Sequence, residues 1–272
     1  MTDAEAQAGG APFEIVPGGD ARLLLLCDHA ANALPPGYGT LGLPESELAR
    51  HIAYDIGAAA VTRALAARLG APAILTRYSR LLIDPNRGED DPTLVMRLSD
   101  GAIVPGNART DGTERAARIA AFHRPYHAAI DARIDAALGA GIVPALVSVH
   151  SFTPAWKGVA RPWHVGVLWD RDPRLPCLLL DALSADPALV VGDNEPYRGT
   201  LRGDTMFRHG TGRGLAHALV EIRQDLIADE AGAGAWAARL ADLLGPALGR
   251  QDLHQIRHFG STTEAFATGE DR

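Results

Sequence analysis

Four consecutive leucines, residues 23–26, are the feature that most constrains the fold of this chain. An uninterrupted apolar run of this length, bounded by turn signals, predicts a strand that is buried on both faces of a sheet. The run ends at Asp28 and His29, and the helix-breaking Pro-Pro-Gly of residues 35–37 follows soon after. A buried strand that ends in titratable side chains is typical of the sheet edge at which α/β proteins bind ligands.

Further strand-length apolar runs alternate with longer amphipathic segments along the chain. Strands are predicted at residues 13–16, 22–27, 72–76, 80–83, 144–149, 164–168, 189–191 and 216–222. Helices are predicted at residues 44–69, 113–138, 174–184 and 229–248, and Pro125 predicts a kink or break in the second of them. This alternation predicts a three-layer α/β/α fold with a mostly parallel or mixed central sheet.

Length and composition bound the organisation of the chain. Its 272 residues contain no internal repeat and no linker, so we expect one domain over residues 12–249. Residues 1–11 are expected to be a loose N-terminus, and residues 250–272 a loose polar tail. Cys27 and Cys177 lie in apolar runs, which indicates no disulfide scaffold and favours a reducing cytoplasm.

The charge and the apolar runs also exclude classes of partner. The formal net charge of −7 lacks the basic footprint of a nucleic-acid-binding protein. No apolar run reaches the length of a membrane span, and residues 1–11 do not have the pattern of a signal peptide. A small anionic substrate remains compatible, because it needs only local arginines.

Several predicted strands end in polar groups that can carry chemistry. These ends hold Asp28 and His29, the Asp-Pro-Asn-Arg of residues 84–87, His150 and Ser151, and Glu221. The carboxyl ends of parallel strands meet at one edge of a sheet, so distant segments of the chain can supply one site.

Two histidines and one carboxylate form a common ligand set for catalytic zinc, with a fourth position left for water. We expect His29 and His150 to supply the imidazoles, and Asp55, on the predicted helix 44–69, the carboxylate. The metal would lower the pKa of its water and polarise a carbonyl, and Glu221 would be the general base. One divalent metal is expected, with zinc first and manganese, iron or cobalt as alternatives.

Arginines near these strand ends suit bidentate capture of a substrate carboxylate. Arg80 and Arg87 are the candidates. Plain structural roles stay open: the arginines could form salt bridges, and Asp55 could be part of a solvated helix pair. Ser151 next to His150 suggests a serine nucleophile, but the Gly-x-Ser-x-Gly elbow is absent.

A set of short segments carries a resemblance to a known family. They are His29 followed by Pro35, residues 51–57 (His-Ile-Ala-Tyr-Asp-Ile-Gly), 77–87 (Arg-Tyr-Ser-Arg-Leu-Leu-Ile-Asp-Pro-Asn-Arg), 123–127 (His-Arg-Pro-Tyr-His), 149–152 (Val-His-Ser-Phe), 194–197 (Asn-Glu-Pro-Tyr), 208–210 (Arg-His-Gly) and 220–223 (Val-Glu-Ile-Arg). With these segments, the chain resembles a divergent branch of the N-formylglutamate amidohydrolase family over roughly residues 13–248. The fold of that family is similar to that of the zinc carboxypeptidases.

The resemblance implies hydrolysis of the amide of an N-acylated acidic amino acid, which yields formate and glutamate in the namesake reaction. It also implies that Asn86 and Arg87 hold a substrate carboxylate and that Glu221 is the catalytic glutamate. Carboxypeptidases take their second metal ligand three residues after the first histidine, where this chain has Asn32. Asp55 is therefore the expected carboxylate ligand. Residues expected to contact substrate in addition are His127, Tyr197 and His209, although packing roles stay open for the two histidines.

Two classes of function follow from these features. The first is a hydrolase acting on a carbon–nitrogen bond other than a peptide bond, or a related metallopeptidase or deacylase with another acyl substrate. The second is a non-catalytic binding or sensor protein for an acidic metabolite on the same fold. The combination of His29, His150 and Glu221 favours the enzyme, because a protein that only binds needs no general base.

Overall fold

The computed structural model describes residues 10–263. Within this range, seven strands form one sheet in the order β1-β3-β2-β6-β11-β9-β10. Their bounds are β1 Phe13–Val16, β2 Leu23–Cys27, β3 Ala73–Thr76, β6 Ala145–Phe152, β9 Val165–Leu168, β10 Val191–Asp193 and β11 His217–Arg223. Strands β3, β2, β6 and β11 are parallel, whereas β1 and β9 each pair antiparallel with a neighbour. The sheet is therefore mixed, with a parallel centre.

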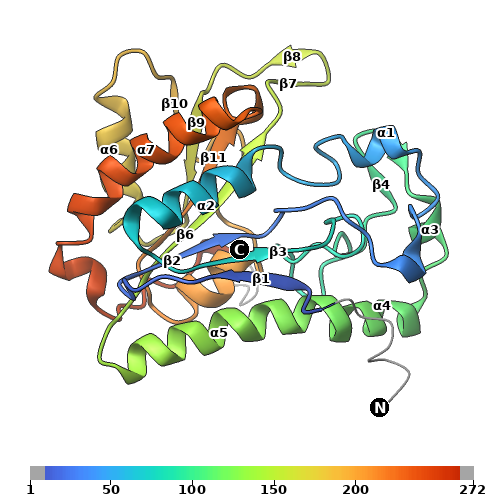
Figure 1. Ribbon diagram of the computed structural model, residues 1–272, viewed down its shortest axis with the longest axis horizontal. Coiled ribbons are helices and arrows are strands. Elements are labelled where there is room, and N and C mark those ends of the chain that lie inside the picture. Colours follow the sequence, from blue (N-terminus) through green and yellow to red (C-terminus); the bar gives the residue numbers. More distant parts are fainter. Residues whose placement is uncertain (1–9, 264–272) are drawn as a thin grey trace, which may run out of the picture.

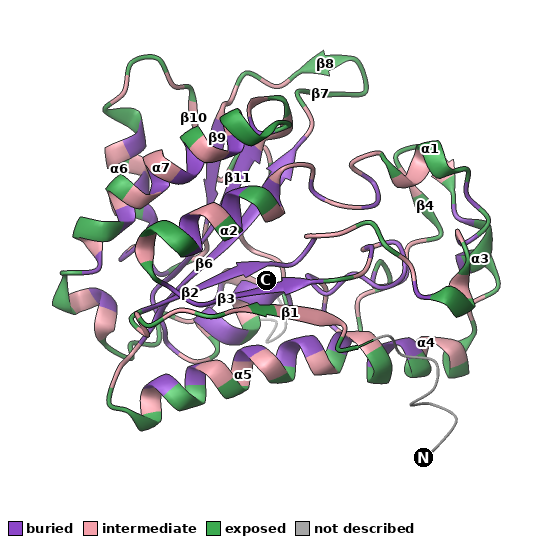
Figure 2. Cartoon of the chain, viewed as in Figure 1, coloured by how far each residue is buried: buried purple, intermediate pink, exposed green. Residues whose placement is uncertain are grey.

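Helices cover both faces of this sheet, so the predicted three-layer α/β/α fold is confirmed (Figure 1). One face carries α2 (Ala58–Leu69), α6 (Pro176–Ser184) and α7 (Glu230–Ala247). The other carries α5 (Arg124–Gly139), which α4 (Gly112–Arg118) precedes in the chain. The leucine run of β2 serves both layers: Leu23 and Leu25 face α2 and α7, and Leu24 and Leu26 face α5. Figure 2 shows the central strands as the buried part of the molecule.

The prediction of one continuous helix over residues 44–69 is wrong in its first half. Only α1 (Glu45–Leu48) and α2 are helical, and residues 49–57 form turns. Gly57 has a left-handed backbone with φ of 82°, and the Asp55 N–H donates to the carbonyl of His29 at 2.9 Å instead of continuing a helix. These contacts with other segments fix the backbone around Asp55.

The predicted strand at residues 80–83 is also wrong, although its side chains are buried as expected. The Leu82 N–H donates to the Ser79 carbonyl, and Ser79 Oγ accepts from the Leu81 N–H, so the segment forms a turn. Leu81 and Leu82 instead join two small apolar clusters under the loops at one end of the sheet. Burial alone does not distinguish a strand from a packed turn.

The remaining elements shape the loops around the sheet edge. The long loop after residue 89 contains the hairpin β4 (Leu98–Ser99) and β5 (Ala102–Ile103) and the short helix α3 (Pro105–Ala108). A second hairpin, β7 (Ala155–Trp156) and β8 (Val159–Ala160), extends β6 beyond the sheet. A π-helical turn, Ile119–His123, joins α4 to α5 just before Pro125, where the sequence predicts a kink or break. A second π-helical turn, Phe207–Thr211, precedes β11, and 3₁₀ turns span Pro36–Tyr38, Gln224–Leu226 and Gln251–His254.

The segment after residue 249 is not loose where the structure describes it. Leu253 is fully buried, Arg174 donates to the carbonyls of Asp252 and Gln255, and Ser261 Oγ donates to Asp170. The expectation of a loose polar tail therefore fails for residues 250–263, because a buried arginine and an aspartate of the body bind its backbone and side chains. Residues 264–272, and residues 1–9 of the predicted loose N-terminus, lie outside the described residues.

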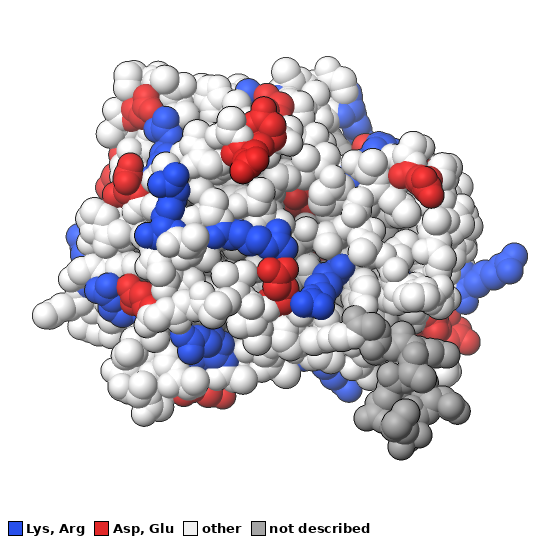
Figure 3. Space-filling view, in the orientation of Figure 1, with Lys and Arg blue, Asp and Glu red and all other residues white. Residues whose placement is uncertain are grey.

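Charged side chains are dispersed over the surface. Lys and Arg alternate with Asp and Glu across the face drawn in Figure 3. Ion pairs such as Arg63 with Glu14 and Arg239 with Asp186 join residues distant in sequence. The expectation that nucleic acid is not a partner stays a prediction.

Gly57 offers a test of how the Asp55 turn is held. An added Cβ would lie 2.1 Å from the Ile227 carbonyl oxygen, and the φ of 82° is unfavourable for other residues. We expect Gly57→Ala to lower the free energy of unfolding by at least about 2 kcal/mol, from left-handed strain and steric overlap. The control is Gly70→Ala at the other end of α2, where φ is 62° and no atom lies within 4 Å of the new Cβ. For this control we expect the free energy of unfolding to fall by only about 1 kcal/mol. Urea unfolding measures both variants, and equal decreases would contradict the role of the close contact.

Candidate metal centre

The carboxyl edge of the parallel strands brings His29, Asp55 and His150 together. His29 follows β2, and His150 lies on the neighbouring strand β6. Asp55 reaches them from the turn before α2. One ligand atom from each residue lies within 4.8 Å of the others, and all three side chains are buried. The cluster could therefore hold a metal ion.

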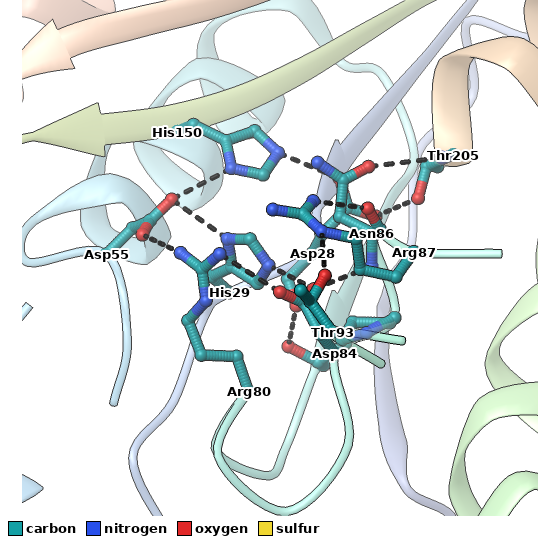
Figure 4. Close-up of polar contacts among 12 residues, drawn as sticks. Asp28, His29, Asp55, Arg80, Asp84, Asn86, Arg87, Thr93, His150 and Thr205 are labelled. Carbon is teal, nitrogen blue, oxygen red and sulfur yellow. Dashed lines mark hydrogen bonds and ion pairs between the residues drawn. The ribbon is translucent and has the colours of Figure 1, made fainter. Parts of the chain in front are cut away.

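The two imidazole rings present the same nitrogen to one carboxylate oxygen. His29 Nδ1 lies 3.2 Å and His150 Nδ1 lies 2.8 Å from Asp55 Oδ2. The rings stand edge to face, with centroids 4.8 Å apart. Figure 4 shows the three groups converging, with Asn86, Arg87 and Thr205 beyond the two rings from Asp55.

The outer nitrogen of each ring contacts a second carboxylate. His29 Nε2 lies 2.7 Å from Asp84 Oδ1, and His150 Nε2 lies 2.9 Å from Asp28 Oδ2. A carboxylate in this position keeps a proton on Nε2 and leaves the Nδ1 lone pair for a metal ion. Such a pair of outer carboxylates is the usual support of metal-binding histidines.

The cluster needs positive charge at its centre, which either protons or a metal ion can supply. If both rings were neutral with protons on Nε2, two lone pairs would face the Asp55 carboxylate. Burial opposes a charged imidazole, yet hydrogen bonds to Asp28 and Asp55 raise the pKa of His150 well above its ordinary value. Burial alone would raise the pKa of Asp55, because it disfavours the charged carboxylate. The two histidines nevertheless hold this pKa well below its usual range. Asp55 Oδ1 accepts no hydrogen bond within residues 10–263, so the donor set fits a divalent cation as well as protons.

Asp28 and Asp84 are further members of the cluster to which the sequence analysis gave no specific role. Asp28 also accepts hydrogen bonds from the hydroxyls of Tyr126, Ser148 and Thr205. Asp84 also accepts from Arg80 Nη2 at 3.0 Å and from the Asn86 N–H at 2.9 Å. Both aspartates directly follow an apolar run, which indicates a position at the edge of the sheet. The sequence does not reveal which imidazole each of them contacts.

Glu221 lies beside the cluster on β11, in register with His150 on β6. Its side chain is buried, and its Oε2 has no hydrogen-bond partner in the described part of the chain. Burial raises the pKa of Glu221 to about 7. The carboxyl group can therefore gain and lose a proton near neutral pH, as a general base and acid must.

A cavity of about 540 Å³ opens onto these groups. Four of the predicted substrate-binding residues line it, namely Arg80, Asn86, Arg87 and Tyr197. Arg80 is held against the cluster, 3.0 Å from Asp84 and 3.5 Å from Asp55. Arg87 donates to the Asn86 carbonyl and to Thr93 Oγ1, and no carboxylate of residues 10–263 pairs with it. Its charge is thus open to a ligand.

His127 and His209 do not line the cavity, so the structure does not place them where a substrate would contact them. Both are fully buried, and His127 Nδ1 lies 2.9 Å from His209 Nε2. His127 Nε2 contacts the Pro85 carbonyl at 3.0 Å, and His209 Nδ1 contacts Asp131 at 3.1 Å. The pair supports the backbone of the Asp84 to Arg87 segment from behind. The sequence pointed to both histidines as possible substrate contacts, but it does not show on which side of that segment they lie.

The comparison with protein families matches the N-formylglutamate amidohydrolase profile to residues 21–228 of the chain. The chain belongs to the N-formylglutamate amidohydrolase family. This confirms the resemblance found in the sequence. Membership makes the chain a hydrolase acting on carbon–nitrogen bonds other than peptide bonds, an amidohydrolase.

Solved structures of similar proteins agree with this fold. A gene product of Agrobacterium tumefaciens shares 36% identity over 91% of this chain and 98% of its own, with a TM-score of 0.83. An N-formylglutamate amidohydrolase from Ralstonia eutropha shares 24% identity over 89% and 99%, with a TM-score of 0.68. The comparison with curated proteins found no match. Within residues 10–263, no helix has the length and apolar character needed to span a membrane.

Asp204, a further cavity residue that sequence gave no reason to choose, provides a pH test. Burial raises the pKa of Asp204 to about 7, whereas an unfolded aspartate titrates near about 3.9. Between these values the folded protein holds a proton that the unfolded chain has released, so this contribution to stability is lost as pH rises through about 7. Asp204→Asn removes that loss.

We therefore expect the stability of Asp204→Asn relative to wild type to increase by at least about 1 kcal/mol between pH 5 and pH 8. The measurement is urea unfolding at both pH values with a chelator present, so that metal loss does not contribute. The control is Asp100→Asn, a partly exposed side chain of the same cavity that pairs with Arg50. A difference between Asp204→Asn and wild type that does not change with pH would contradict the prediction.

Proposed function

We propose that this chain is a metal-dependent amidohydrolase that cleaves the amide of an N-acylated acidic amino acid, with N-formyl-L-glutamate as the reference substrate. The observation that carries the proposal is the position of Glu221. Among residues 10–263, one oxygen of its carboxylate has no hydrogen-bond partner and Arg87 pairs with no carboxylate. Both side chains share one cavity with the buried cluster of His29, Asp55 and His150.

The ligand set favours zinc. Two imidazole nitrogens and one carboxylate, with an open position towards a cavity, are typical of catalytic zinc sites. A bound zinc ion would polarise the scissile carbonyl and lower the pKa of a water molecule to near 7. Asp28 and Asp84 would keep the two imidazoles in the tautomer that binds the ion.

Glu221 would move the proton of the reaction. Its carboxylate would accept a proton from the attacking water, whose oxygen forms a bond to the acyl carbon. It would then donate this proton to the amide nitrogen as the carbon–nitrogen bond breaks, releasing a carboxylic acid and the free amine. A pKa raised to about 7 suits both directions of this transfer.

Asn86 and Arg87 would hold a carboxylate of the amino acid. The Asn86 carboxamide oxygen accepts from the Thr205 N–H at 3.1 Å, which fixes its side chain and leaves its amide nitrogen as a donor. The Arg87 guanidinium has no carboxylate partner in the described part of the chain, so an anionic substrate would neutralise it. Arg80, already paired with Asp84, would add positive charge beside the scissile carbonyl.

A sensor protein that binds an acidic metabolite is the second candidate. It would need the arginines of the cavity but has no use for a buried Glu221 whose carboxylate is free to exchange a proton. Desolvating an unpaired carboxyl group costs stability, so its presence at the cluster favours catalysis.

The first test is hydrolysis of N-formyl-L-glutamate with and without a chelator. We expect formate release to require a bound divalent metal, measured by elemental analysis. Glu221→Gln should retain the metal and lose about 10²- to 10⁴-fold in kcat, because the proton transfer is lost and the ligands are kept. A protein that binds no divalent metal under any condition would reject the metal centre, and full activity of Glu221→Gln would remove this residue from the mechanism.

The outer carboxylates give an independent test of the metal site. Asp84→Asn keeps the shape of the side chain but removes the charge that holds the proton on His29 Nε2. We expect zinc affinity, measured by competition with a chromogenic chelator, to fall about 10- to 100-fold. Asp100→Asn, which alters an aspartate of the cavity wall without touching either imidazole, is the matched control. Equal zinc affinities for the two variants would contradict the role assigned to Asp84.

A further inference from the structure

The cavity is larger than the reference substrate needs. Its volume is about 540 Å³. Pockets of this size bind drug-sized ligands, whereas N-formyl-L-glutamate has only about a dozen non-hydrogen atoms. Beyond the cluster, Met96, Trp156 and Tyr197 also line the cavity and present apolar and aromatic surface. A formyl group would leave this surface unused.

Trp156 and Tyr197 form a wall that is held in place before any ligand binds. The guanidinium of Arg161 lies 5.4 Å from the centre of the Trp156 ring and 5.0 Å from that of Tyr197. Its Nη1 donates to Tyr197 Oη and to Thr153 Oγ1, both at 3.1 Å. Arg161 itself does not line the cavity, so its contacts with the two rings leave the cavity free. Such a preorganised aromatic surface binds a flat group at little entropic cost.

The cavity residues near α1 and the β4–β5 hairpin do not call for a charged group. Their cation, Arg50, pairs with Glu47 and at 2.7 Å with Asp100. Met96, another cavity residue, lies in the loop before the β4–β5 hairpin. Arg198 also lines the cavity and is exposed to solvent. The experiment therefore includes a substrate with an anionic acyl group, which Arg198 could bind.

The aromatic wall and the carboxylate-binding pair lie on different sides of the cluster. On the Asp55 side, β6 runs past His150 to Ser151, whose N–H donates to Asp55 Oδ2 at 3.3 Å, and the chain continues into the β7–β8 hairpin that carries Trp156. Arg161, directly after this hairpin, donates to Tyr197 Oη and so keeps the phenol beside it. Asn86 lies beyond the imidazoles from Asp55 (Figure 4). With the amino-acid carboxylate at Asn86 and the scissile carbonyl at the cluster, the acyl group extends towards Trp156 and Tyr197.

We infer that Trp156 and Tyr197 form a subsite for a planar, apolar acyl group larger than formyl, such as an arylcarbonyl group. This inference rests on the proposed amidohydrolase function. Water adds its oxygen to the acyl carbon and the carbon–nitrogen bond breaks, so the products are the corresponding carboxylic acid and the free acidic amino acid. No further reactant is needed.

The experiment compares kcat/KM of the zinc-loaded protein for N-formyl-, N-acetyl-, N-succinyl- and N-benzoyl-L-glutamate. We expect the N-benzoyl compound to exceed the N-formyl compound at least about tenfold, since each buried carbon of a well-fitted pocket contributes to transition-state binding. Trp156→Ala should lower the N-benzoyl value at least about tenfold and the N-formyl value less than about threefold. Val159→Ala, an exposed residue of the same hairpin, is the matched control and should change neither.

Several outcomes would overturn the subsite while leaving the proposed function intact. Hydrolysis of N-formyl-L-glutamate with no gain for N-benzoyl-L-glutamate is one, and an equal effect of Trp156→Ala on all substrates is another. A preference for the N-succinyl compound would assign the outer cavity to an anionic acyl group at Arg198 instead. If no compound is hydrolysed, the proposed function fails, and calorimetric binding of N-benzoyl-L-glutamate decides the subsite: equal affinities of wild type and Trp156→Ala overturn it.

Discussion

The carboxylate of Asp55, facing the Nδ1 atoms of two buried imidazoles, is the interaction on which the rest of this site depends. Burying these three groups together lowers the stability of the fold unless positive charge balances the carboxylate. Protons or a divalent cation can supply it, and Asp28 and Asp84 on the outer nitrogens stabilise either state. The parallel pairing of β2 with β6 sets the two histidines side by side, and the Asp55 N–H bond to the His29 carbonyl sets the third group.

The cluster is surrounded by further buried polar groups, which an apolar core would not contain. Asp28, directly after β2, accepts hydrogen bonds from β6, from α5 and from the segment before β11, so the sheet, one helix and one loop meet at this carboxylate. Two further buried polar groups depart from an apolar core. Glu221 Oε2 has no hydrogen-bond partner within residues 10–263, and burial raises the pKa of Asp204. Buried polar groups of this kind are weak evidence for stability and good evidence for a functional site. The aromatic wall at Trp156 then gives the same cavity room for more than a formyl group.

Strand-end reasoning worked where the sheet geometry alone places a side chain. His29, His150 and Glu221 follow from buried runs whose parallel carboxyl ends must share one edge. It was less useful where contacts with other segments decide the backbone. Helix periodicity over residues 44–69 placed Asp55 on a helix, yet its turn is fixed by the His29 carbonyl and by the approach of Ile227 to Gly57. The apolar residues 80–83 were buried as predicted, but in a turn.

The sequence by itself determined the layered α/β fold, the strand ends that carry polar groups and the family, because these depend on hydrophobic periodicity and on short contiguous motifs. Only the tertiary structure decided which carboxylate reaches which imidazole, since those partners are separated by 55 and 122 residues. It also decided that His127 and His209 support a loop from behind, and that Arg161 fixes an aromatic wall at the cavity. Periodicity specifies which face of an element is buried, whereas the direction of a polar side chain within that buried space depends on contacts between distant segments.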